Sequence, residues 1–248
     1  MVTGECALLP EPKLVTNVEW GALLFEFSEI TKEYKVVRIF TRNNWSLGRN
    51  EASICTVGTD KGWRVLNQTI PLPGGEEWRI CEVNLNGALH WISENSYLGN
   101  RLFSFDIGEE KLHPVPQPLG EFIRTRHNAL AVLKGCLCIC QLSSCFELDI
   151  WWMKEYGALK SWTKETIAIS RNLYQPNYPN PVLFWKGQEI LLCGGYSNLV
   201  SYDTEKKSFT KVSISVDDPP RSGNAILHVP CFLSLKDLIK SRQNVMDA

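Results

Sequence analysis

Three hairpin-like segments recur along the chain at intervals of about fifty residues. Each consists of an apolar run, a two-residue turn that contains glycine, and a second apolar run; the turns are Asn86-Gly87, Lys134-Gly135 and Lys186-Gly187. Because Asn-Gly and similar pairs adopt the positive φ angles of a tight hairpin turn, each segment is predicted to form two antiparallel strands. Repetition at this period indicates a stack of equivalent modules and not one irregular sheet.

Each hairpin is followed by two further apolar stretches, which we interpret as the third and fourth strands of the same sheet. The third strands are predicted at residues 101–106, 146–151 and 199–203, and the fourth strands begin at Leu112, Trp162 and Phe209. An earlier copy of the unit has a longer first turn. Its four strands are predicted at residues 23–27, 34–40, 53–57 and 63–66.

Four modules of four antiparallel strands predict an all-β chain folded as a β-propeller, in which neighbouring sheets, or blades, stack around an axis. Consecutive apolar residues at Val36-Val37, 137–140 and 190–193 are typical of inner strands that are covered on both faces. The chain ends are expected to add a partial closing blade from residues 6–14 and 224–235. The alternative is a β-sandwich of short strands, which does not predict a repeating four-stranded unit.

This interpretation divides the chain into three parts. Residues 1–20 are expected to be the N-terminal remnant of a closing blade, residues 21–235 the propeller domain, and residues 236–248 a C-terminal tail.

Composition argues against two classes of function. The formal net charge is −1, whereas nucleic-acid binding needs a concentrated excess of basic side chains, so no nucleic-acid partner is expected. The sequence has no apolar run of about 18 residues or more, so no membrane-spanning helix is predicted. The first ten residues are too polar for a secretory signal, and the nine cysteines are therefore interpreted as reduced thiols in the cytoplasm or nucleus.

No motif in the sequence predicts catalysis, and we assign no catalytic residue, cofactor or metal. Cys136, Cys138 and Cys140 alternate along one predicted strand, with Cys145 nearby; structural zinc sites favour Cys-x-x-Cys pairs, so these thiols are expected to be small core residues. His90 lies within a predicted strand and is expected to pack in the core. Three carboxylate pairs are interpreted as solvated charges in turns: Glu76-Glu77, Glu109-Glu110 and Asp217-Asp218.

The links between strands suggest where a partner binds. In a propeller, links from the first to the second strand and from the third to the fourth leave one face, and the remaining links leave the opposite face. The first set is mostly short here, whereas the second set includes long links at residues 41–52, 67–79, 93–100, 113–128 and 170–181. Long loops on a rigid scaffold commonly carry binding sites.

Aromatic and arginine side chains, which dominate protein interfaces, occur in these long links. The candidate partner-binding residues are Trp45, Trp78, Tyr97, Phe122, Arg124, Arg126, Tyr174 and Tyr178.

A series of short motifs runs through residues 20–235. They are KEYKVVRI (32–39), TVGTDKGWR (56–64), NLNGALHW (84–91), FSFD (103–106), DIWWMKEYG (149–157), SWTK (161–164), YD (202–203) and HVP (228–230). Together they resemble the F-box-associated interaction domain of plant F-box proteins, a kelch-like β-propeller. The resemblance implies a module that recognises protein substrates for a cullin-type (SCF) ubiquitin ligase. No helical F-box segment precedes residue 20, so docking on the ligase adaptor is not expected of this chain.

Two other functions remain open at this point. One is a glycan-binding or enzymatic propeller, which would need a cluster of carboxylates or a metal site in its central channel. The other is a truncated, non-functional remnant whose ring of blades does not close.

Overall fold

The computed structural model describes residues 9–11, 18–42, 50–59, 62–71, 83–93, 101–118, 128–144, 147–169, 180–185, 189–194 and 198–212. Apart from one 3-10 helix at Leu159–Ser161, the regular structure of these residues consists entirely of β-strands. Within these ranges, no helix has the length and apolar character needed to cross a membrane.

The strands form four separate antiparallel sheets, each with four strands in chain order. Sheet 1 contains β1 (Val18–Ser28), β2 (Glu33–Arg42), β3 (Asn50–Thr56) and β4 (Arg64–Leu66). Sheet 2 contains β5 (Val83–Leu85), β6 (Ala88–Ser93), β7 (Arg101–Asp106) and β8 (Lys111–Pro114). Sheet 3 contains β9 (Asn128–Leu133), β10 (Cys136–Ser144), β11 (Glu147–Met153) and β12 (Trp162–Ala168). Sheet 4 contains β13 (Asn180–Trp185), β14 (Glu189–Gly194), β15 (Asn198–Asp203) and β16 (Ser208–Val212).

These four sheets confirm the predicted all-β class and the four repeating units, with small differences at strand ends. The first residue of β4 is Arg64, which pairs with Ile54, whereas the sequence predicted a start at Trp63. β10 continues to Ser144, beyond the apolar run that predicted it. Gln141 pairs with both neighbouring strands and is buried despite its polar side chain, and Leu142 and Ser144 continue the pairing with β11.

The hairpin turns have the backbone geometry that the sequence predicts. Asn86 and Gly87 have φ angles of 55° and 75°, and Lys134 and Gly135 have φ angles of 50° and 71°. Positive φ at both central residues matches the right-handed twist of the flanking strands and fixes the pairing of β5 with β6 and of β9 with β10. The third predicted turn, Lys186-Gly187, lies outside the described residues.

Sheets 1 and 2 pack face to face through a shared apolar cluster. Leu24 and Ile54 of sheet 1 meet Trp91 and Phe105 of sheet 2, and all four side chains are buried. The indole nitrogen of Trp91 donates a 3.0 Å hydrogen bond to the carbonyl oxygen of Pro71, so burial of the ring leaves no polar atom unsatisfied.

Sheets 2 and 3 meet in the same way. Ile92 and Leu102 of sheet 2 pack against Leu137 and Ile139 of sheet 3. At the outer edge of this interface, Trp162 of β12 donates a 2.9 Å hydrogen bond from its indole nitrogen to the carbonyl oxygen of Pro116.

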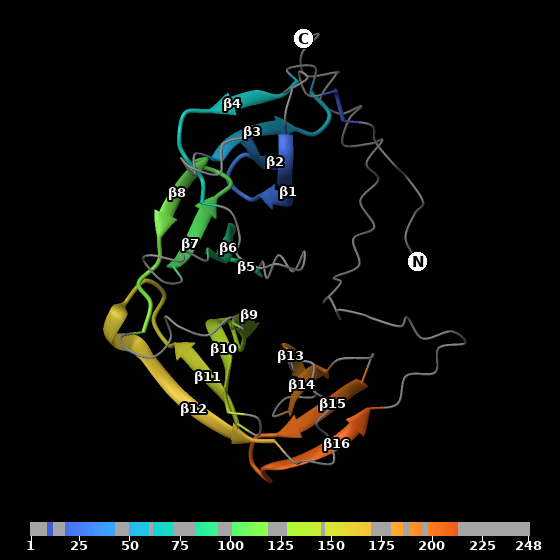
Figure 1. The fold of residues 1–248 in the computed structure, drawn as a ribbon, viewed down its shortest axis with the longest axis vertical. Helices are drawn as coiled ribbons and strands as arrows, with labels where there is room; N and C mark the ends of the chain where they lie inside the picture. The colour runs from blue at the N-terminus through green and yellow to red at the C-terminus, as the bar shows by residue number, and fades with distance from the viewer. Residues whose placement is uncertain are drawn as a thin grey trace, which may run out of the picture.

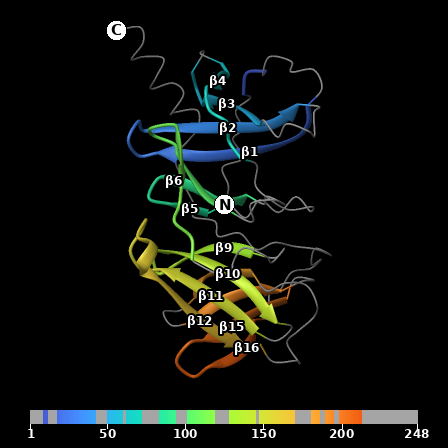
Figure 2. The same ribbon diagram turned by 60° about the vertical axis from the view of Figure 1, so that its left-hand side comes forward.

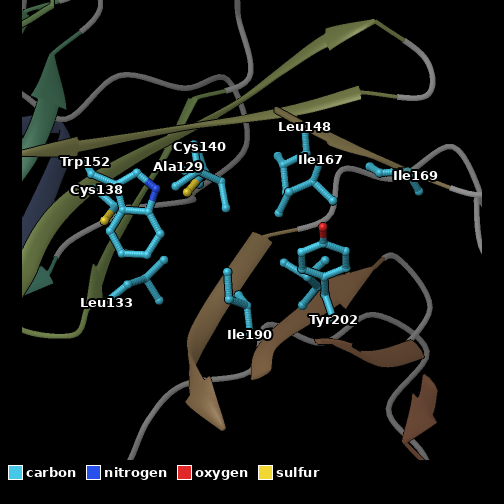
Figure 3. Close-up of a cluster of buried hydrophobic side chains, with 13 residues drawn as sticks. Ala129, Leu133, Cys138, Cys140, Leu148, Trp152, Ile167, Ile169, Ile190 and Tyr202 are labelled. Carbon is cyan, nitrogen blue, oxygen red and sulfur yellow. The ribbon is translucent and has the colours of Figure 1, made fainter. Parts of the chain in front are cut away.

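The third interface joins sheets 3 and 4 (Figure 3). Trp152 and Ile167 of sheet 3 approach Ile190 and Tyr202 of sheet 4 in one buried cluster. The ammonium group of Lys154 lies 4.5 Å from the centre of the Trp152 ring and covers the edge of this cluster by a cation–π contact.

The four sheets follow one another around an arc (Figure 1). The first strand of each sheet (β1, β5, β9 and β13) lies toward the centre of the arc, and the fourth strand of each (β4, β8, β12 and β16) lies on the outside. β9 contacts both β5 and β13, so the inner strands of sheets 2, 3 and 4 adjoin one another. This radial arrangement is propeller-like, and four separate sheets rule out the two-sheet sandwich considered as an alternative.

We expect Gly87→Ala to lower the free energy of unfolding by about 1 kcal/mol, because the added Cβ is strained at positive φ. No atom lies within 4 Å of the position of that Cβ, so the loss comes from the backbone conformation alone. Urea denaturation of the wild type and the variant measures it. Asn86→Gly is the control and should not destabilise the protein; unchanged stability of Gly87→Ala would contradict the proposed role of the turn.

Candidate functional site

The two ends of the strands differ in the length of the links that join them. The links β1–β2, β5–β6, β7–β8 and β9–β10 contain four, two, four and two residues, and several short turns gather on the left-hand side of Figure 2. We call this side the short-turn face. Because the strands are antiparallel, the links β2–β3, β4–β5, β6–β7, β8–β9 and β12–β13 leave from the opposite side, the long-link face. Two short links, β10–β11 with two residues and β14–β15 with three, also leave from this side, and the β3–β4 and β11–β12 links of the short-turn face have seven and eight residues. The division predicted from the sequence therefore holds for the three longest links, β4–β5, β8–β9 and β12–β13.

All eight candidate partner-binding residues fall, by sequence, in links between strands that are joined on this side, and all eight lie outside the described residues. These are Trp45, Trp78, Tyr97, Phe122, Arg124, Arg126, Tyr174 and Tyr178. The described strands define only where each link begins and ends.

A cluster of charged side chains joins sheets 1 and 2 at the short-turn face. The ammonium group of Lys35 on β2 lies 2.8 Å from Oε1 of Glu110, which belongs to the β7–β8 turn, and donates a 3.1 Å hydrogen bond to the carbonyl oxygen of Ile107. Arg64 at the start of β4 binds the other carboxylate oxygen of Glu110. The side chain of Lys35 is 4% exposed and that of Glu110 is 17% exposed, so water screens this contact only partly.

Gln68 completes this cluster. Its amide nitrogen donates a 2.7 Å hydrogen bond to the backbone carbonyl of Glu110, and its amide oxygen accepts a 3.2 Å hydrogen bond from the backbone nitrogen of Leu112. Burial raises the pKa of Glu110, but hydrogen bonds and positive charge from Arg64 and Lys35 outweigh it and hold the pKa below its ordinary value. The carboxylate therefore stays ionised and binds sheet 1 to sheet 2.

The interpretation of Glu109-Glu110 as solvated turn charges is therefore wrong for Glu110 and right for Glu109. Glu109 is exposed and pairs only with the exposed Lys111, at 3.3 Å. No signal in the sequence distinguishes these two carboxylates, because the partner of Glu110 comes from a strand in another sheet.

A second polar contact joins sheets 2 and 3. His90 of β6 is completely buried, which confirms the prediction that it packs in the core. Its Nε2 atom lies 2.7 Å from the hydroxyl oxygen of Tyr156, which comes from the β11–β12 turn, and the two rings meet edge to face. Burial lowers the pKa of His90, and weak contacts with the backbone at Val83 and Ala88 oppose this effect only in part.

The geometry of this pair makes protonation of His90 unfavourable. Among the described residues, Nδ1 of His90 has no hydrogen-bond partner of normal geometry. A proton added to the ring would therefore place a positive charge in a buried interface that offers no well-placed acceptor for Nδ1. Burial also raises the pKa of Tyr156, although 46% of its surface is exposed, so both groups are neutral near pH 7.

The alternating thiols of β10 belong to the core, as predicted. Cys138 and Cys140 are buried in the cluster between sheets 3 and 4, and Cys136 packs at its edge. Burial raises the pKa of Cys138 to about 12, so this thiol is neither a ready nucleophile nor a metal-binding thiolate. Within the described ranges, no group of three or more His, Cys, Asp and Glu side chains is placed to bind a metal ion.

The sequence matches a known protein family over most of its length. The profile of the family described as "F-box associated beta propeller domain" matches residues 2–229. Three similar proteins of Arabidopsis thaliana are F-box protein At3g07870 (35% identical over 66% of this chain and 44% of its own length), F-box protein CPR1 (29%, 57% and 36%) and F-box/kelch-repeat protein At3g23880 (26%, 56% and 38%). The chain thus spans less than half the length of these curated relatives.

We expect Glu110→Gln to lower the free energy of unfolding by about 2 kcal/mol, because the buried ammonium group of Lys35 loses its nearer counter-ion and retains Glu33, at 4.0 Å. Since the folded-state pKa of Glu110 lies below its ordinary value, its stabilisation is complete above about pH 4.5 and is lost as the pH falls toward the folded-state value. Denaturant titrations at several pH values measure both effects. Glu109→Gln is the matched control and should change stability little; equal effects of the two variants would contradict the assignment.

The free energy of unfolding should fall as the pH drops below about 6.5, the ordinary pKa of histidine, toward the lower pKa of His90 in the folded chain. In this range the unfolded chain binds the proton readily and the folded chain does not. His90→Gln keeps a polar group near Tyr156 without a titrating ring, so its stability should depend less on pH in this range. Thermal unfolding of the wild type and of His90→Gln, measured at about pH 7.5, 6.5 and 5.5, tests this prediction. The exposed His113 provides the control His113→Gln, and a slope as steep in His90→Gln as in the wild type would refute the prediction.

Proposed function

The chain belongs to the F-box associated β-propeller family, and on this basis we propose that it is the protein-recognition part of an F-box protein. In this proposal its long-link face holds a protein substrate, and ubiquitin transfer is carried out by a ligase complex to which the whole F-box protein contributes. The observation that supports it best is that the three longest links, β4–β5, β8–β9 and β12–β13, leave from the same side of the array. In this proposal the links of successive sheets together form the recognition surface.

We propose a binding function and not catalysis. The buried charged groups of the described residues are engaged in holding strands and sheets together: Glu110 binds Lys35 and Arg64, and Asp149 lies 2.6 Å from both Lys164 Nζ and Thr166 Oγ1. A propeller enzyme or a glycan-binding propeller would need carboxylates whose oxygens face a ligand. The binding function therefore has the stronger support.

We further propose that the arc closes into a ring through a blade built from the chain ends, residues 6–14 and 224–235, and that the protein acts in the cytoplasm or nucleus. Closure would make the chain cooperative in unfolding. A remnant with an open ring would instead melt over a broad range of temperature, which calorimetry distinguishes.

Partner binding should depend on the aromatic residues of the β12–β13 link. We expect Tyr174→Ala combined with Tyr178→Ala to weaken partner binding by about tenfold or more, because tyrosines at interfaces often contribute 1 kcal/mol or more each. The partner is first identified by proximity labelling in plant tissue, then purified and titrated by calorimetry against both forms of the chain.

The melting temperature of this double variant should remain close to that of the wild type. Lys206→Ala with Lys207→Ala, in the exposed β15–β16 turn of the short-turn face, is the control and should leave the affinity unchanged. Loss of affinity in the control alone would move the recognition surface to the short-turn face. Loss of folding in the tyrosine variant would show that these side chains belong to the core.

A further inference from the structure

The link from β11 to β12, residues 154–161, is longer than a connection between these strands requires. In sheets 2 and 4, the corresponding links β7–β8 and β15–β16 join the third strand to the fourth with four residues each, whereas this link has eight. The seven-residue β3–β4 link of sheet 1 lies only partly within the described residues. Four residues are therefore enough for this connection, and the additional residues of the β11–β12 loop call for another explanation.

The β11–β12 loop is closed by hydrogen bonds between its own residues. At its two ends, the backbone nitrogen of Lys154 donates a 3.2 Å hydrogen bond to the carbonyl oxygen of Ser161. The hydroxyl oxygen of Ser161 lies 2.8 Å from the carbonyl oxygen of Glu155 and 2.7 Å from that of Ala158. Compact surface loops with adjacent ends frequently carry function. These bonds hold the loop in one conformation, so a partner that binds it loses little affinity to ordering of the loop.

The two halves of the loop differ in what they contribute to the core. In the first half, Tyr156 contacts the buried His90 of sheet 2 and so helps to hold sheets 2 and 3 together. The second half contains the 3-10 helix Leu159–Ser161, none of whose residues is buried. Leu159 is 44% exposed and belongs to none of the apolar clusters formed by the described residues. Packing of the core therefore does not account for this apolar side chain.

The loop and the turn beside it in sheet 3 carry more positive than negative charge. Lys154 and Lys160 belong to the loop, Lys134 belongs to the β9–β10 turn of the same sheet, and all three are exposed. Glu155 is the one acidic residue in these two links. Three ammonium groups against one carboxylate leave a net positive charge, which favours a partner of negative charge.

From these observations we infer that the β11–β12 loop is a second protein-binding surface, and that its partner is an acidic protein segment that carries an apolar side chain. In this complex Leu159 packs against the apolar side chain, while Lys134, Lys154 and Lys160 attract the carboxylates. A single exposed leucine is common on protein surfaces, but here it stands on a preformed loop with an excess of positive charge. The loop leaves the face opposite to the longest links, so the inference does not rest on recognition by those links.

Selection from a displayed library of random peptides, carried out on the purified whole chain, tests this inference. An excess of the double variant Leu159→Ser with Lys160→Ser is added as competitor and removes peptides that bind elsewhere on the protein. Both substituted side chains are exposed, so the variant should keep the melting temperature of the wild type. The peptides that remain should be richer in Asp and Glu than the starting library and should contain an apolar residue. Absence of such peptides, or a lack of acidic residues in them, would overturn the inference.

Calorimetric titration of one selected peptide separates the apolar contribution from the charged one. Leu159→Ser should weaken binding by about tenfold, because it removes a side chain that becomes buried in the complex. Lys160→Gln should make the affinity depend less on salt concentration. Ile30→Ser, which changes an exposed apolar residue in the β1–β2 turn of the same face, is the matched control and should leave the affinity unchanged. Equal losses in Leu159→Ser and Ile30→Ser, or binding to the wild type that does not depend on salt, would contradict the inference.

Discussion

The fold depends on the burial of both faces of each inner sheet. Along β10, Leu137 and Ile139 pack toward sheet 2, whereas Cys138 and Cys140 pack toward sheet 4. Because successive side chains of a strand point to opposite faces, one strand contributes to two interfaces. A single sheet would expose apolar surface on each side, so each sheet is stable only between neighbours. Ile70, Val115 and Ile169, which lie in the links after the fourth strands of sheets 1, 2 and 3, also pack in these interfaces.

Apolar packing alone does not fix the orientation of one sheet on the next, because it is not directional. The polar contacts at the short-turn face are directional and fix this orientation. Lys35 and Glu110 connect sheets 1 and 2, and His90 and Tyr156 connect sheets 2 and 3. Burying such groups costs solvation, so we interpret them mainly as fixing how one sheet sits on the next. The short-turn face thus fixes how sheets 1, 2 and 3 are oriented on one another.

Features of the fold that depend on adjacent residues could be predicted from the sequence, whereas contacts between sheets could not. The Asn86-Gly87 and Lys134-Gly135 turns were predictable because positive φ is a property of two adjacent residues, and the doubly covered strands because their residues are consecutively apolar. The contact of Glu110 with Lys35 was not predictable, because 75 residues separate them and only the packing of two sheets brings them together. The eight candidate residues of the long-link face lie outside the described residues, so their assignment stays a prediction.

Closure of the array and recognition by its loops are physically linked. Sheets 2 and 3 are held on both faces, whereas sheet 1 presents Leu23 and Phe25 on a face that no described sheet covers. A sheet held on one side has more freedom to tilt, and the links that leave it share that freedom. Affinity falls with the fraction of molecules in the binding-competent arrangement. The closing blade proposed above would remove this freedom and so favour a partner that contacts links from several sheets, even if no residue of that blade touched the partner.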